Sequence, residues 1–188
     1  MKLIESKILS VLAVFCTIIA FVACKDAADS SQKAVVVTKK QKQLDLDSIN
    51  KALISKENNA INDYIKTNGN EFIKTGTGLR YYIENQGDSI LIKTGEIIVL
   101  DYESRLLNGD LLYSSKENGR KVFEVGHGGV ESGLEEAILH LHRGDEAEII
   151  IPARLAHGLT GDGGRIPPNA TIVYKVKIIE NQTNSNKN

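Results

Sequence analysis

After Gly69, the apolar residues of this chain tend to recur at every second position, in short runs that glycine, asparagine-glycine or proline interrupts. A period of two places alternate side chains on opposite faces of an extended backbone, so the runs are typical of β-strands with one buried face. Asn108-Gly109 is a strong signal for a hairpin between two such runs. We expect strands over residues 71–74, 78–84, 96–107, 110–113, 122–125, 146–151 and 171–179.

One helix is expected within this series of strands, from Glu131 or Ser132 to Arg143. Residues 152–170 contain several glycines and show no regular period, which predicts an irregular loop. Many short strands with a single short helix indicate the α+β class. We expect an antiparallel sheet curled around that helix, in a domain over residues 71–180 that is followed by a polar tail over 181–188.

The N-terminus has the layout of a secretory signal peptide. Residues 8–23 are uncharged and largely apolar, with lysines before them and charged residues after them. As a helix at about 1.5 Å per residue, the run spans roughly 24 Å, less than the ~30 Å hydrocarbon core, which disfavours a permanent membrane helix. Its junction with Cys24 resembles a bacterial lipobox, which implies cleavage of residues 1–23 and a lipid anchor on Cys24. A secreted protein with an incidental thiol is the alternative.

A polar segment, residues 24–45, is expected to be a lipidated flexible tether. A helical arm should follow over residues 46–70, with Asp47 or Ser48 as its cap and an end near Gly69. The apolar positions at helical spacing are Ile49, Leu53, Ala60, Ile61, Tyr64 and Ile65. This stripe is compatible with core packing and with a homodimer through the arm, and the sequence does not decide between them.

Composition excludes several classes of function. The chain has 23 Lys and Arg against 24 Asp and Glu, which lacks the basic excess of a nucleic-acid-binding protein. Both cysteines, Cys16 and Cys24, lie within the first 24 residues, so the domain has no disulfide framework and no cysteine zinc site. No nucleophile elbow or phosphate-binding glycine loop is present. His140 and His142 alone are a weak metal signal, and we expect neither metal nor cofactor.

Three segments near the C-terminus carry a family resemblance. VESGLEEAI (residues 130–138), RGDEAEIIIP (143–152) and AHGLTGDGGRIPPNATIVY (156–174), in that order, resemble the FKBP family of peptidyl-prolyl cis-trans isomerases. The resemblance implies an FKBP-like sheet curled around one helix, with proline-containing peptides or proteins as substrates. Together with the N-terminal features, the sequence is most similar to the gliding-motility-associated isomerase lipoproteins.

The resemblance also implies the site residues. Tyr102 would lie on the pocket wall, and the backbone N–H of Glu131 would donate to a substrate carbonyl. His157 stands where the family has a tyrosine hydroxyl donor. We class these three as candidate catalytic residues. The candidate substrate-binding residues are Leu112, Tyr113, Phe123, Val130, Leu134, Ile166 and Tyr174.

Three departures from the family pattern predict reduced catalysis and weak affinity for the family's macrolide inhibitors. His157 replaces a tyrosine, and Tyr113 replaces an aspartate beside the prolyl amide. Asp162 and Arg165 add charges to a loop that often has more neutral residues.

An apolar site suits prolyl isomerisation because the barrier of about 18–20 kcal/mol comes from amide resonance, and a twisted amide has less charge separation than a planar one. We expect a prolyl isomerase that assists the folding of exported or envelope proteins. It would be lipid-anchored outside the cytoplasm, at a periplasmic or outer-membrane surface. A non-catalytic proline-peptide-binding or assembly lipoprotein of a motility or secretion machine is the alternative.

Overall fold

The computed structural model describes residues 42–179. The expected signal peptide, the Cys24 lipidation site and the polar tail over 181–188 lie outside the described residues. The chain divides into two compact units, Met1–Ile54 and Ser55–Asn188.

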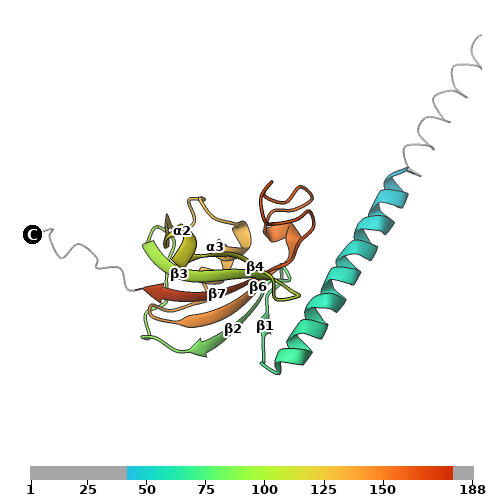
Figure 1. Ribbon diagram of the computed structural model, residues 1–188. Helices are drawn as coiled ribbons and strands as arrows, with labels where there is room; N and C mark the ends of the chain where they lie inside the picture. Colours follow the sequence, from blue (N-terminus) through green and yellow to red (C-terminus); the bar gives the residue numbers. More distant parts are fainter. Residues whose placement is uncertain (1–41, 180–188) are drawn as a thin grey trace, which may run out of the picture. The chain divides into compact units, whose positions relative to one another are not determined.

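The second unit contains a seven-stranded sheet in which every pair of neighbours is antiparallel. The strand order is β1-β2-β6-β7-β3-β4 (Figure 1), and β5 also pairs with β3. The strands are β1 (Ile73–Lys74), β2 (Arg80–Asn85), β3 (Ile97–Leu106), β4 (Leu111–Ser114), β5 (Lys121–Glu124), β6 (Glu146–Ile151) and β7 (Ile172–Ile179). Each overlaps a run that the period-two pattern predicts.

Three short helices accompany the sheet: α2 (Ser115–Asn118), α3 (Ser132–Ile138) and the 3-10 helix η1 (Ala153–Leu155). The sheet curls around α3, whose Leu134, Ala137 and Ile138 are buried in the main hydrophobic core. This confirms the α+β class and the antiparallel sheet around one short helix.

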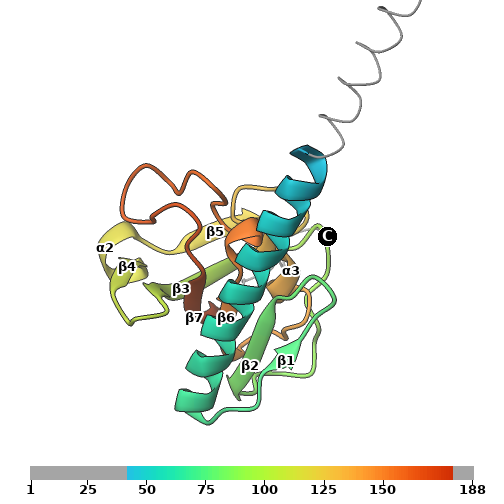
Figure 2. The ribbon, with the colours of Figure 1, turned by 90° about the vertical axis from the view of Figure 1, so that its right-hand side faces the viewer.

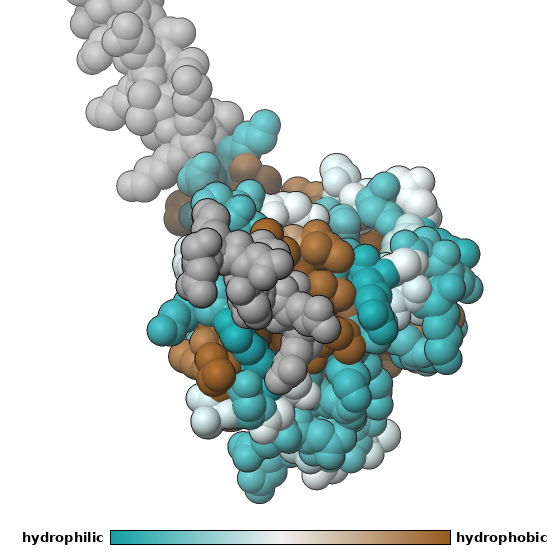
Figure 3. Space-filling model, turned by 90° about the vertical axis from the view of Figure 1, so that its left-hand side faces the viewer, coloured by the Kyte–Doolittle hydropathy of each residue, from teal (hydrophilic) through white to brown (hydrophobic). Residues whose placement is uncertain are grey.

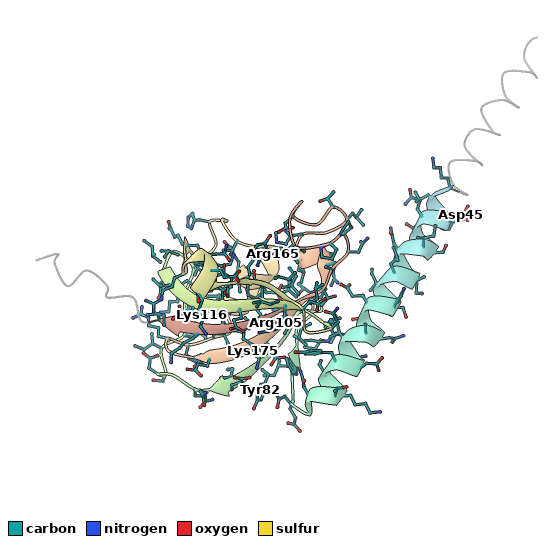
Figure 4. All side chains as sticks on the ribbon, in the orientation of Figure 1. Asp45, Tyr82, Arg105, Lys116, Arg165 and Lys175 are labelled. Carbon is teal, nitrogen blue, oxygen red and sulfur yellow. The ribbon has the colours of Figure 1, made fainter. Side chains whose placement is uncertain are left out.

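Alternation along the strands separates the two faces of the sheet. On β7, Ile172, Tyr174 and Val176 belong to the main core on the α3 side, whereas Val173 belongs to a second cluster on the outer face. Outer-face side chains include Tyr82, Arg105 and Lys175, which Figure 4 labels on β2, β3 and β7. The inward positions of the strands therefore build the floor of the candidate site.

The arm helix, described over residues 42–68, crosses the boundary between the two units. Its residues 55–68 pack on the outer face of the sheet, where Ile61 is fully buried against Ile150 and Val173 (Figure 2). The Tyr64 hydroxyl donates to Glu148 Oε1 at 2.7 Å, and burial together with this carboxylate raises the pKa of Tyr64 to about 12. This part of the arm is core packing, one of the two alternatives that the sequence leaves open.

Residues 42–54 of the arm helix are all exposed, including the apolar Leu46, Ile49 and Leu53. The expected cap at Asp47 or Ser48 is wrong, because residues 42–46 are already helical. The Gln43 side chain donates to the Asp47 carboxylate at 3.0 Å across one helical turn, which stabilises the helix beyond the expected start.

The α3 helix ends at Ile138, earlier than the expected Arg143. The buried Asp145 carboxylate accepts hydrogen bonds from the backbone N–H of His142 at 2.8 Å and of Gly87 at 2.7 Å. These bonds hold the residues after α3 in a turn against a neighbouring loop, and a continued helix could not make them. Helix α2 was not predicted from the sequence, since it has only four residues.

On the face that Figure 3 shows, hydrophilic residues predominate, and apolar residues gather mainly near its centre. Over residues 42–179, no helix combines the length and the apolar composition that crossing a membrane requires.

Candidate functional site

The structure brings the predicted wall residues together on the α3 side of the sheet. Six of them come from four strands, one helix and the loop between β6 and β7, and each of these six exposes 7% or less of its surface. The buried members are Tyr102, Leu112, Phe123, Leu134, Ile166 and Tyr174. Tyr113 and Val130, also predicted, are partly buried and pack against the same cluster. We call this set the aromatic cluster.

Tyr102 on β3 and Tyr174 on β7 form its centre. They point to the same side because Tyr102 pairs with Val176 and Ser104 with Tyr174, which keeps the two tyrosines in phase on neighbouring strands. Their ring centroids are 6.0 Å apart with a 44° interplanar angle, within the range of favourable aromatic pairs. Burial and the Glu131 carboxylate raise the pKa of both phenols, so both hydroxyls stay protonated at neutral pH.

Glu131, at the N-terminus of α3, places a carboxylate beside the aromatic cluster. Its side chain is 7% exposed, and Oε1 accepts hydrogen bonds from the Tyr174 hydroxyl at 2.7 Å and from His157 Nε2 at 3.1 Å. The sequence indicated only a role for the backbone N–H of Glu131. The side-chain contacts depend on residues far apart in the sequence, and no pattern in the chain indicates them.

Opposing effects set the protonation state of Glu131. Burial raises the pKa of its carboxyl. The Lys121 ammonium and the hydrogen bonds from Tyr174, from its own backbone N–H and from His157 together lower this pKa by more than burial raises it, so the pKa of Glu131 lies below the ordinary value. The group is therefore ionised at neutral pH. Its Oε2 is buried and has no hydrogen-bond partner among the described residues, and Lys121 Nζ lies 4.0 Å away.

Lys121 on β5 is a site residue that the sequence analysis missed. Its ammonium lies 5.1 Å from the centroid of the Tyr102 ring, within the range of a cation–π interaction. Lys121 and Phe123 are two residues apart on one strand and so share a face, and this parity was the available signal.

The departures Tyr113, Asp162 and Arg165 form one network, which we call the loop latch. The Tyr113 hydroxyl donates to Asp162 Oδ2 at 2.6 Å and accepts from the Arg165 backbone N–H at 3.2 Å. Asp162 Oδ1 accepts from the backbone N–H of Gly164 at 2.8 Å and of Ile166 at 2.9 Å. The latch thus fixes the backbone on which Ile166 enters the aromatic cluster.

Arg165, labelled in Figure 4, connects the loop latch to β4. Its Nη1 donates to the Leu112 carbonyl at 2.7 Å and to Glu117 at 2.9 Å, and its guanidinium lies 5.5 Å from the centroid of the Tyr113 ring. Burial raises the pKa of the Asp162 carboxyl, but the hydrogen bonds from Tyr113, Gly164 and Ile166 lower it more, so Asp162 is a carboxylate at neutral pH.

The two histidines considered for metal binding make intramolecular contacts. His140 stacks on Tyr81, with ring centroids 5.2 Å apart, and His142 Nδ1 lies 3.4 Å from Asp145 Oδ2. Within residues 42–179, no three His, Cys, Asp or Glu side chains are grouped as metal ligands.

This arrangement places hydrogen-bond donors at the edge of a buried apolar and aromatic cluster. The donors are the Tyr174 hydroxyl, the His157 ring and the Glu131 backbone, and all three are directed at the Glu131 carboxylate. Such a set can bind a carbonyl group in apolar surroundings.

Comparison with known proteins places these features in a family. The family model described as FKBP-type peptidyl-prolyl cis-trans isomerase matches residues 89–179. The "Probable FKBP-type peptidyl-prolyl cis-trans isomerase FkpA" of Neisseria meningitidis is 37% identical over 123 residues, which are 65% of this chain and 42% of that protein. "FK506-binding protein 2" of Dictyostelium discoideum is 31% identical over 109 residues, which are 56% of this chain and 82% of that protein.

The fold comparison agrees. The crystal structure of AtFKBP13 superposes with a TM-score of 0.56 at 27% identity, covering 58% of this chain and 98% of that one. This confirms the FKBP-like form of the sheet. The chain spans only part of the bacterial relatives that it matches first: 42% of the length of the Neisseria meningitidis protein and 49% of that of a Haemophilus influenzae protein.

Proposed function

This chain belongs to the FKBP-type peptidyl-prolyl cis-trans isomerase family, and we propose that it catalyses the cis-trans isomerisation of X–Pro bonds. The observation that carries the proposal is the aromatic cluster, which gathers residues from β3, β4, β5, β7, α3 and the β6–β7 loop around two tyrosines. No cofactor is needed, because the reaction breaks no covalent bond.

In the proposed mechanism, the proline ring packs on Tyr102, Tyr174 and Ile166 while the preceding carbonyl accepts from the Glu131 backbone N–H. An apolar environment disfavours the planar amide, with its separated charge, relative to the twisted one. The cluster therefore binds the transition state more strongly than the ground state and lowers the barrier of about 18–20 kcal/mol. Leu112, Phe123, Val130 and Leu134 complete the proposed apolar wall.

Substrate must compete with the Glu131 carboxylate for the same donors. Tyr174 and His157 both donate to that carboxylate, and the cluster side chains expose little surface. A substrate carbonyl gains hydrogen bonds here only when Glu131 gives them up. This competition supports the expectation of reduced catalysis and of weak binding of the family's macrolide inhibitors.

A protease-free isomerisation assay with the purified full chain and a proline-containing peptide tests the proposal. We expect the approach to cis-trans equilibrium to accelerate in proportion to protein concentration. A rate equal to the uncatalysed one, even at high protein concentration, would overturn the proposed activity.

The occupied donors also favour a second candidate function, in which the protein holds proline-containing segments without isomerising them. The same purified chain distinguishes the two in a peptide titration. Saturable binding with an uncatalysed rate would establish the second function.

We further propose that the protein acts on exported or envelope proteins and is anchored outside the cytoplasm by a lipid on Cys24. The apolar run that ends at this cysteine supports the proposal. Labelled palmitate should enter the protein, and Cys24→Ser should abolish the labelling. Unchanged labelling of the variant would exclude this attachment site.

We propose in addition that the protein forms a homodimer through the arm helix, as part of a gliding-motility or secretion machine. Leu46, Ile49 and Leu53 are about half exposed at spacings of three and four residues, which place them on one helix face. Ile49→Asp should convert a dimer to a monomer in sedimentation equilibrium, whereas Lys51→Gln should not. A monomeric wild type would overturn the dimer.

A further inference from the structure

Glu57, on the arm helix, contacts both ends of the loop over residues 152–171. Its Oε1 accepts from the Ala153 backbone N–H at 2.7 Å and from the Thr171 hydroxyl at 2.7 Å. Ala153 lies just after β6 and Thr171 just before β7. One carboxylate oxygen therefore joins the two ends of the loop.

This loop carries two candidate site residues, His157 and Ile166. The last ladder pair of β6 and β7 is Ile151 with Ile172, and the chain leaves the sheet directly after it. The Glu57 contact extends the connection between the two strands beyond the ladder, at the point from which the loop departs.

Glu57 is held in place by its own helix. Asn58 Oδ1 accepts from the buried Arg80 side chain at 2.8 Å, and Ile61 is fully buried on the sheet. The Arg80 guanidinium also interacts electrostatically with Glu57. The carboxylate is thus a fixed point on the outer side of the sheet.

Hydrogen bonds connect this fixed point to the site. The Ala153 carbonyl accepts from the Gly158 N–H at 2.8 Å, directly after His157, and the Gly158 carbonyl accepts from the Asn169 N–H at 2.8 Å. The Leu155 carbonyl accepts from the Ser132 hydroxyl at 3.2 Å, next to Glu131. A displacement of Ala153 would therefore shift the backbone next to His157, through Gly158, and the backbone next to Glu131, through Leu155 and Ser132.

We propose that Glu57 is a positioning residue, which sets the loop so that His157 and Ile166 meet the aromatic cluster. The inference rests on the proposed isomerase function, because the geometry that it maintains is that of the proposed site. It makes the arm helix a part of that site's framework.

The test compares Glu57→Ala, which removes the acceptor, with Glu57→Gln, whose amide oxygen can accept the same two hydrogen bonds. Asp63→Asn on the same helix is the matched control. Thr171→Val removes one donor and leaves the Ala153 contact, so it serves if Glu57→Ala does not fold. Isomerisation kinetics, peptide affinity and amide hydrogen exchange are measured on the full chains.

For Glu57→Ala we expect KM to rise about tenfold with kcat within about twofold, because the loop supplies binding contacts to ground and transition states alike. Amides of residues 153–171 should exchange about tenfold faster, with β2 and β3 unchanged. For Glu57→Gln, KM and the exchange rates of the loop amides should stay within about twofold of wild type, because the amide oxygen keeps both hydrogen bonds. For Thr171→Val, which keeps one of the two, both quantities should lie between those of wild type and of Glu57→Ala.

Either of two results for Glu57→Ala would overturn the inference. The first is a KM and an amide exchange rate over residues 153–171 that equal those of wild type. The second is an exchange rate that rises equally in the loop and in every strand, which would indicate a merely structural role. An inactive wild type would instead refute the proposed function, and the exchange pattern and peptide affinity would still decide the role of Glu57.

Discussion

At Glu131, one carboxylate oxygen accepts two hydrogen bonds beside an otherwise apolar cluster, while the other has no hydrogen-bond partner among the described residues. Hydrogen bonds to a charged acceptor are about twice as strong as neutral ones, so the carboxylate holds Tyr174 and His157 firmly. The side chain of Glu131 therefore stabilises the folded site, and it occupies the two donors, Tyr174 and His157, that a substrate carbonyl would otherwise accept from.

Glu131→Gln should separate these two effects. The amide can still accept from Tyr174 and His157, but less strongly, so we expect kcat/KM to rise by about threefold to tenfold and the free energy of unfolding to fall by about 1–2 kcal/mol. Isomerisation kinetics and urea unfolding measure the two. Glu124→Gln, an exposed position on β5, is the control and should change neither. A fall in kcat/KM would mean that the carboxylate assists substrate.

Tyr113→Phe should loosen the loop latch, because the hydroxyl both donates to Asp162 and accepts from Arg165. We expect a loss of about 1 kcal/mol in the free energy of unfolding and a higher KM for peptide. Tyr82→Phe on the outer face of β2 is the matched control. Unchanged KM in Tyr113→Phe would show that the latch does not position Ile166.

The residues of the candidate site differ in how far the sequence could predict them. Tyr102 and Tyr174 were accessible, because the family resemblance names them and strand parity places them on one face. The contacts of Glu131 and the loop latch were not. The hydrogen bonds of Glu131 with Tyr174 and His157, and those of Tyr113 with Asp162 and Arg165, join residues separated by 26 to 52 positions, and only the folded chain brings these together.

At the scale of elements, α3 approaches η1 through a glycine. A Cβ at Gly133 would meet the Ile151 side chain closer than real contacts allow, and it would lie 3.0 Å from the Leu155 Cβ, which is tighter than most real contacts. Gly133 thus lets the helix that carries Glu131 lie directly against the base of the β6–β7 loop.

Gly133→Ala should therefore destabilise the protein. Alanine gains up to about 1 kcal/mol in helix propensity, but overpacking costs about 1–3 kcal/mol, so we expect a net loss of about 1–2 kcal/mol in urea unfolding. Gly76→Ala is the control, since its added Cβ would meet nothing within 4 Å. Equal stability of the two variants would show that α3 shifts freely away from η1.

The elements themselves were predictable where many residues share one period. Every expected strand overlaps an observed one, because alternation over several positions leaves little freedom in which face is buried. The failures were α2 and η1, which are too short to show a period, the start of the arm helix, which lies before the expected cap, and the end of α3, which the Asp145 contacts set.

At the scale of the whole molecule, carboxylates link stability to pH. The pKa values of Glu96, Asp101, Glu131, Glu146 and Asp162 all lie below their ordinary values. Solvent screens the contribution of the largely exposed groups. Glu131 is the most deeply buried of the five, so its ionisation should contribute most to the pH dependence of folding.

The sign follows from proton binding. The folded state lowers the pKa of Glu131 below the 4.5 of an ordinary glutamate, so between the two values the unfolded chain binds more protons. The stabilisation from this group is complete above pH 4.5 and is lost as the pH falls through the folded-state pKa. Urea unfolding of wild type and Glu131→Gln should therefore differ at pH 7 by about 1–2 kcal/mol and converge in acid, whereas Glu124→Gln should follow the wild type throughout. A difference that stays constant from pH 7 into acid would mean that the carboxyl is not ionised in the folded protein, and the competition that we propose for its donors would lose its basis.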